Sequence, residues 1–167
     1  MLNKFPFVLG LALFVTNAAT AEEWTFTEGK VDVHCPDHWK AETDDGSLII
    51  HDKDEEVVIY VELVDAKNLD DAVKHLDKEL EKHVKNVKSN DDVKHAKTHG
   101  LDVVWVEATG KVDDKDVHIM VDFVTTPNHK VLMLCGIVED AKWDKHEKDI
   151  EAVYEGIKPS DKKKKKK

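Results

Sequence analysis

The residues best suited to chemistry stand together near the start of the chain, in the segment His34-Cys35-Pro36-Asp37-His38. Imidazole nitrogens and thiolate sulfurs are common ligands of zinc and copper. His34, His38 and Cys35 are therefore the candidate metal ligands, with the two histidines approaching each other across a bend at Pro36. The alternative is the end of a structural strand with exposed histidines, because neighbouring side chains on a strand point to opposite faces.

The two cysteines, Cys35 and Cys135, are a candidate disulfide if the chain is exported. Such a bridge would close a loop of about 100 residues and add roughly 4 kcal/mol in the chain-entropy model. The alternative is two buried thiols in strands that are not adjacent. A thioredoxin-type redox motif is absent, since the position three residues after Cys35 is His38.

No catalytic signature stands out in the remaining residues. Ten histidines are scattered without a His-Glu-x-x-His pair, which is typical of solvated residues that titrate near pH 6.5 and bind transition metals adventitiously. A calcium loop starting at Asp52 would need glycine and a carboxylate where Val57 and Leu63 stand. Neither a Gly-x-Ser-x-Gly motif nor a phosphate-binding glycine loop is present. We therefore assign no catalytic residue and no cofactor, and expect the protein not to be an enzyme.

The acidic composition of the chain limits the kinds of partner that it is expected to bind. The chain has 35 acidic residues against 25 lysines and no arginine, for a net charge of −10. Nucleic-acid binding needs a basic surface, so a nucleic-acid partner is not expected. The four tryptophans are expected in the core or covering it, with the alternative that one lines a ligand groove.

Two terminal segments are expected to lie outside the folded domain. Residues 1–21 combine an apolar run with small residues at Ala19 and Ala21, which is typical of a cleaved secretory signal peptide. We expect a secreted protein, periplasmic or extracellular, that begins at Glu22 and has no transmembrane segment in its mature form. Residues 22–160 are the predicted domain. Residues 161–167 are expected to be disordered, and Lys162–Lys167 either to be a solvated end or to contact anionic surfaces weakly.

The elements that must position these residues follow from periodicity. Alternating or β-branched segments predict strands, ended by turn residues; they cover 24–26, 30–35, 47–51, 57–64, 92–98, 101–112, 115–125 and 130–138. Apolar residues at three- and four-residue steps predict one long helix over 68–88 and a second over 140–157. Strands that are apolar on both faces need cover on both sides. The sequence therefore predicts an α+β fold with one antiparallel sheet of about six to seven strands, flanked by two long helices in an α/β/α sandwich.

The order of these elements, with the segments "VDVHCPDHW", "NLDDAVKHL" and "GLDVVWVEATGKVDDKDVHIMVDFV", resembles the PsbP-like fold family. This family includes the extrinsic photosystem II subunit, a Ran-binding import factor and small bacterial envelope proteins. The resemblance spans about residues 24–160, and the matched residues Pro36, Trp39 and Gly100 are structural. It implies an accessory or binding protein and carries over no catalytic residue.

The resulting hypothesis is a secreted, non-enzymatic accessory or binding protein of the cell envelope whose partner the sequence does not name. The alternative is a periplasmic zinc- or copper-binding protein that uses its histidines. These two hypotheses differ in whether the folded protein holds a stoichiometric metal site.

Overall fold

The computed structural model describes residues 22–90 and 92–161. The predicted signal peptide (1–21) and Lys162–Lys167 lie outside the described residues, so the expectations about them stay predictions. Within the described ranges, no helix is both long and apolar enough to cross a membrane.

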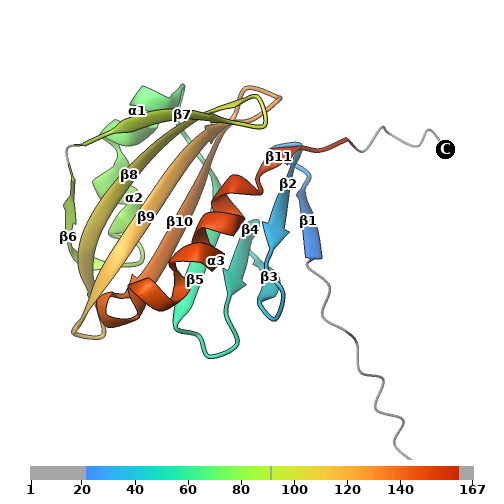
Figure 1. Ribbon diagram of the computed structural model, residues 1–167. Coiled ribbons are helices and arrows are strands. Elements are labelled where there is room, and N and C mark those ends of the chain that lie inside the picture. The colour runs from blue at the N-terminus through green and yellow to red at the C-terminus, as the bar shows by residue number, and fades with distance from the viewer. Residues whose placement is uncertain (1–21, 91, 162–167) are drawn as a thin grey trace, which may run out of the picture.

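A large antiparallel sheet forms the body of the protein, as the sequence predicted (Figure 1). It has eight strands in the order β3-β4-β5-β10-β9-β8-β6, with β7 also paired to β8. The bounds are β3 Lys40–Asp44, β4 Ser47–His51, β5 Val57–Val64, β6 Lys85–Ser89, β7 Lys94–Thr98, β8 Leu101–Val112, β9 Lys115–Thr125 and β10 Val131–Glu139. Because β8 is long, its outer edge is shared: β7 pairs with its first half and β6 with its second.

Tight turns fix the register of three hairpins in this sheet. The two-residue loops Asp45-Gly46, His99-Gly100 and Asp113-Asp114 all have positive φ at both positions. This is the conformation of the turn that matches strand twist, and Gly, Asp and Asn adopt it most readily. The Asp113-Asp114 turn joins β8 to β9, so that Trp105 lies opposite Asp122 and Glu107 opposite Met120.

The prediction of a single sheet was wrong. β1 (Glu22–Phe26), β2 (Val31–Cys35) and β11 (Lys158–Pro159) form a separate three-stranded sheet in the order β1-β2-β11. Pro36 follows β2 and ends its ladder, because proline has no N–H to donate. The short strand β11 was not predicted; it forms because the chain returns along β2 after the last helix.

The prediction of two long flanking helices was also wrong. Only the second of them is long: a 3-10 turn at Asp140–Lys142 leads into α3 (Trp143–Glu155). The first divides into α1 (Leu69–Lys74) and α2 (Leu76–Leu80). Beyond α2 the chain turns and pairs with the free edge of β8 as β6, and Asn86 takes a positive φ that no α-helix allows.

The predicted apolar stripe is nevertheless buried. Leu76, Leu80 and Val84 pack in one core cluster with the face of the sheet that carries Val121, Phe123 and Cys135. A second cluster lies on the opposite face, between the sheet, β2 and α3. Figure 1 shows α3 in front of the sheet and α1 and α2 behind it.

Candidate functional site

The predicted metal ligands at the end of β2 are not brought together. Cys35 is buried in the core cluster beneath α3, whereas His34 is half-buried and its Cβ lies close to Gly156 at the end of that helix. His38 is exposed and has a φ of 71° in the bend after Pro36. Among the described residues, these three do not form a group of ligand atoms within 4.8 Å of one another. A metal site at this position stays a prediction that the arrangement does not favour.

The two cysteines lie in different core clusters, on opposite faces of the large sheet. Cys35 packs with the α3 side and Cys135 with the side of α1 and α2. The structure does not bring the two side chains together, and the disulfide stays a prediction. Burial raises the pKa of the Cys135 thiol to about 12, and the negative charge of Glu62 adds to the effect.

The structure brings together a different group of potential metal ligands, which was not predicted from the sequence. It consists of residues from the turn before β5 and from the start of α3. Ligand atoms of Asp52, Glu56 and His146 lie within 4.8 Å of one another. Glu56 already accepts a hydrogen bond from Lys145, pairs with His146 at 2.9 Å, and has Lys142 Nζ at 3.0 Å. These three partners, Lys145 first, lower the pKa of Glu56 to about 2.

Asp52 is the third member of this cluster, and both of its carboxylate oxygens already accept hydrogen bonds. Its carboxylate accepts hydrogen bonds from the backbone N–H groups of Val57 at 2.9 Å and Asp54 at 3.3 Å. Lysine ammonium groups already neutralise Glu56, so the cluster does not present an open metal site. Its contacts connect α3 to the β4–β5 turn.

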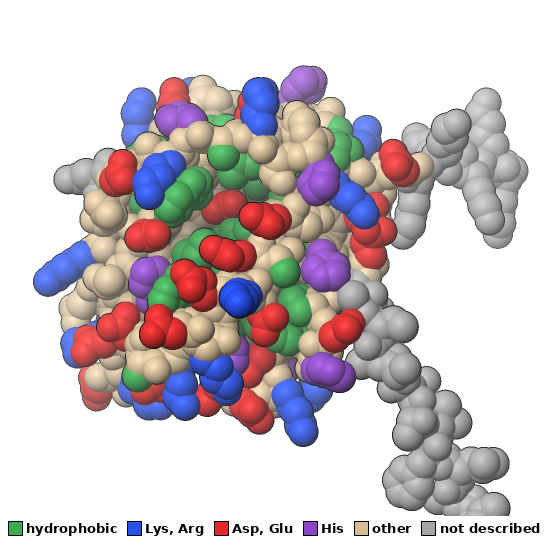
Figure 2. Space-filling view, in the orientation of Figure 1, with side chains coloured by type: hydrophobic (Ala, Val, Ile, Leu, Met, Phe, Trp, Pro, Cys, Tyr) green, Lys and Arg blue, Asp and Glu red, His purple; other side chains and the backbone are tan. Residues whose placement is uncertain are grey.

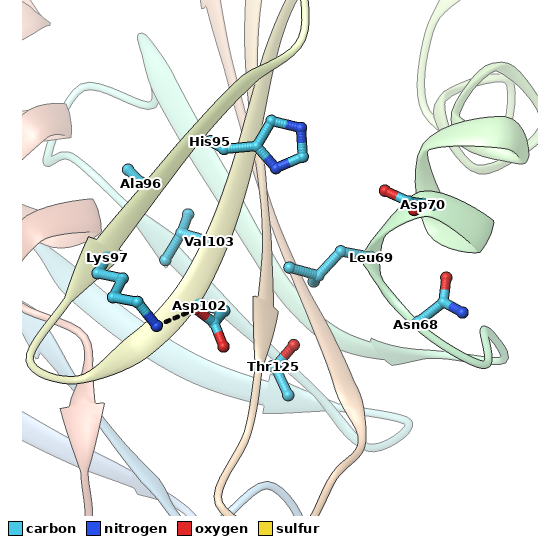
Figure 3. Close-up of a pocket in the computed structure, with 9 residues that line it drawn as sticks. All are labelled: Asn68, Leu69, Asp70, His95, Ala96, Lys97, Asp102, Val103 and Thr125. Atoms are coloured by element: carbon cyan, nitrogen blue, oxygen red, sulfur yellow. Dashed lines mark hydrogen bonds and ion pairs between the residues drawn. The ribbon is translucent and has the colours of Figure 1, made fainter.

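A first cavity, of about 640 Å³, lies between α1 and the strands β7 and β8 (Figure 3). Several of its polar side chains are already engaged within the protein. The side chain of Asn68 caps α1 by accepting from Asp71 N–H, and Lys97 is paired with Asp102. A ligand in this cavity would have to displace these contacts, so the cavity is a weak candidate.

A second cavity, of about 610 Å³, lies between α3 and the sheet at β7, β8 and β9. We call it the acidic groove, because five carboxylates and four large apolar or aromatic side chains line it: Glu107, Asp122, Glu147, Glu151, Glu155, Trp105, Met120, Trp143 and Tyr154. Figure 2 shows acidic side chains gathered near the middle of this face with hydrophobic side chains between them.

Regular secondary structure places these side chains on the two walls. Trp105 and Glu107 lie two positions apart on β8 and so share a face, opposite Asp122 and Met120 on β9. On α3, Glu147, Glu151 and Glu155 recur at four-residue steps and form one stripe along the helix. The helix therefore contributes a row of three carboxylates, and the sheet contributes two more from neighbouring strands.

Tyr154 holds the two walls at a fixed separation. Its hydroxyl donates to the carbonyl oxygen of Met120 at 2.8 Å and lies 3.4 Å from that of Leu134. The helix approaches closely here because the neighbouring strand residue is Gly136, where an added Cβ would lie 2.8 Å from the Tyr154 hydroxyl.

One end of the groove is closed by the β7–β8 hairpin. Thr98 Oγ1 and His99 Nε2 both donate to the backbone carbonyl of Glu155, at 3.3 and 3.1 Å. That carbonyl lies in the last turn of α3, where the helix itself supplies no partner.

Asp122 is a groove carboxylate for which the described residues provide no partner. Its side chain lines the groove, is half-buried, and makes no hydrogen bond or ion pair with any other described residue. Burial raises the pKa of Asp122 from 3.8 to about 7. Buried carboxylates are normally paired, so an unpaired one facing a cavity marks a place where a cation would be stabilised.

The other groove carboxylates are also without counter-ions. Elsewhere in the described chain lysines pair with acidic side chains, as Lys115 does with Glu139 at 2.8 Å and Lys130 with Glu28 at 2.9 Å. No such pair involves Glu107, Glu147 or Glu151 in the described residues. The groove therefore combines carboxylates that lack counter-ions with aromatic side chains, an arrangement suited to binding a cation.

Asp122 was not among the predicted site residues, although its strand carries a signal. Asp122 interrupts the apolar strand "IMVDFV", and a lone carboxylate in such a strand needs an explanation. The tryptophans were expected in the core or covering it, as Trp24, Trp39 and Trp143 do. The alternative, that one of them lines a ligand groove, fits the positions of Trp105 and Trp143. The facing of α3 against β8 and β9 depends on tertiary packing and had no sequence signal.

Comparisons with known proteins agree on the fold. No protein-family model matches the chain, and no curated protein matches it. The solution structure of cyanobacterial PsbP (CyanoP) from Synechocystis superposes with a TM-score of 0.64 at 13% identity, covering 86% of this chain and 94% of that one. LpqN, described as involved in cell envelope biogenesis of Mycobacterium tuberculosis, gives 0.51 at 15% identity, covering 77% and 82%. A structure from Bacteroides thetaiotaomicron gives 0.58 at 14% identity, covering 87% of this chain and 50% of that one.

Proposed function

We propose that this chain, which has the PsbP-like fold, is a secreted, non-enzymatic accessory or binding protein of the cell envelope that takes its ligand or partner in the acidic groove. The observation that carries the proposal is the unpaired, half-buried carboxylate of Asp122 in the lining of a cavity of about 610 Å³. Stability alone does not account for it, because an unpaired buried charge destabilises a fold. Groups of this kind are retained where they serve a binding site.

The description of LpqN as involved in cell envelope biogenesis supports the envelope location by analogy of fold. The predicted leader supports export independently, since its last residues fit a cleavage site. Fractionation of producing cells, with the intact mass of the recovered protein, tests this part. A protein that is retained in the cytoplasm with residues 1–21 attached contradicts it.

The groove is tested by site-specific photo-crosslinking in cells that produce and export the protein. A photoreactive residue replaces Glu151, which is exposed on the helix wall of the groove, and in a matched control it replaces Lys78, exposed on α2 across the sheet. We expect one recurrent adduct at 151 that is absent at 78. The adduct's mass distinguishes a small ligand from a protein partner. Equal labelling at both positions, or none at 151, contradicts the proposal.

A further inference from the structure

We propose that the acidic groove binds a linear aliphatic polyamine, a flexible apolar chain that carries several ammonium groups. This inference rests on the proposed function, in that it names the ligand class of the same groove.

The distribution of the carboxylates selects an extended cation over a single metal ion. Three acidic side chains follow the length of α3, and Glu107 and Asp122 stand on the facing strands. Among the described residues, no three of these groups bring ligand atoms within 4.8 Å of one another, which a metal ion requires. A polyamine places its charges several ångströms apart and can meet carboxylates one at a time.

The walls suit the methylene segments between those charges. Trp105, Trp143 and Met120 present apolar surface in the groove, and aromatic faces also attract ammonium groups. One such contact is already made within the protein, where Lys94 Nζ lies 4.1 Å from the centre of the Trp105 ring. Asp122 provides a half-buried position, at which one ammonium group would pair with an otherwise uncompensated carboxylate.

The cations near the groove do not neutralise it. Lys97 lines the cavity but is paired with Asp102, and Lys94 lies 3.7 Å from Asp92. His99 is engaged with the Glu155 carbonyl. The groove therefore keeps a surplus of negative charge for an incoming ligand.

The test is a calorimetric titration of the exported protein with spermidine at pH 8 and physiological salt, where Asp122 is ionised. We expect saturable binding with one spermidine per chain. Asp122→Asn should weaken this binding more than about tenfold, because it removes one partner of a partly buried charge pair. Glu151→Gln, at an exposed wall position, should weaken it less.

Asp114→Asn is the matched control, because it removes the same charge from an exposed turn outside the groove. We expect its affinity to stay within about twofold of the unmodified protein, since exposed charges contribute little individually. Magnesium chloride at equal charge concentration should not displace spermidine. Absence of saturable binding, an equal loss in Asp114→Asn, or displacement by magnesium overturns the inference.

A hexalysine peptide is titrated in parallel, since lysine side chains carry the same ammonium group and the chain itself contains Lys162–Lys167. Binding of the peptide, lost in Asp122→Asn, without binding of spermidine would overturn the polyamine assignment. A groove-specific crosslink to a protein with no spermidine binding likewise removes the polyamine and leaves the proposed function standing.

Discussion

Replacing Asp122 by asparagine should stabilise the protein, although the substitution alters a half-buried residue. Burial raises the pKa of the Asp122 carboxyl from 3.8 to about 7. Between these values the native protein holds a proton that the unfolded chain has lost, so this group's contribution to stability falls as the pH rises. Asparagine has a similar shape and no charge, so it escapes this penalty.

The size of the expected stabilisation follows from the same difference between the two pKa values. Each pH unit between 3.8 and about 7 is worth about 1.4 kcal/mol, which gives an upper limit of about 4 kcal/mol at pH 8. Part of the side chain still touches water, which screens the charge, so we expect a gain of about 2–4 kcal/mol. With a urea m-value of about 2 kcal/mol/M, the unfolding midpoint would rise by about 1–2 M.

The assay is urea unfolding followed by tryptophan fluorescence at pH 4, 5, 6, 7 and 8, in buffer free of amines. The stability difference between Asp122→Asn and the unmodified protein should be near zero at pH 4 and largest at pH 8. Other titrating groups affect both proteins equally and cancel in the difference. Asp114→Asn, in the exposed β8–β9 turn, should change stability by less than about 0.5 kcal/mol. A gain that does not depend on pH, or a loss at pH 8, would refute the reasoning.

Three further outcomes are expected. Glu56→Gln should lower the melting temperature at pH 7, because the lowered pKa of Glu56 stabilises the fold above pH 4.5. This stabilisation is lost as the pH falls towards 2, so melting curves of the two proteins that stay equally separated down to pH 2 would contradict the prediction. Gly136→Ala should cost about 1–3 kcal/mol through its clash with the Tyr154 hydroxyl, and additive losses in a double-mutant cycle with Tyr154→Phe would argue against that clash. Cys135 should resist alkylation in the native protein at pH 8 and react after denaturation, as followed by mass spectrometry; rapid native labelling would show that it is accessible.

The sequence predicted the elements that depend on local patterns. The three strands β8, β9 and β10 and the helix α3 carry strong periodicity and clear turns, and they form close to the predicted bounds. The turns at Asp113-Asp114 and His99-Gly100 fall between the predicted strands, and they consist of residues of types that accept a positive φ or occur often in turns.

The elements that depend on distant partners were not predicted. The stripe through Val84 and Val87 has helical spacing, yet the chain there extends as β6 because the free edge of β8 offers backbone hydrogen bonds. The small sheet requires β11 to meet β2, two segments more than 100 residues apart. The groove could not be predicted from the sequence for the same reason, since it forms only where α3 crosses β8 and β9.

The division of the outer edge of β8 between β6 and β7 has a consequence for self-association. An unpaired strand edge exposes backbone N–H and C=O groups that can capture a strand from another molecule. Here one end of the large sheet is finished by two five-residue strands in place of one long edge. The other end is β3, whose residues Lys40, Glu42 and Asp44 are exposed and charged, which discourages pairing between copies. Both ends of the large sheet are therefore poor templates for a strand from another copy, and strand addition at this sheet is not the expected route of association.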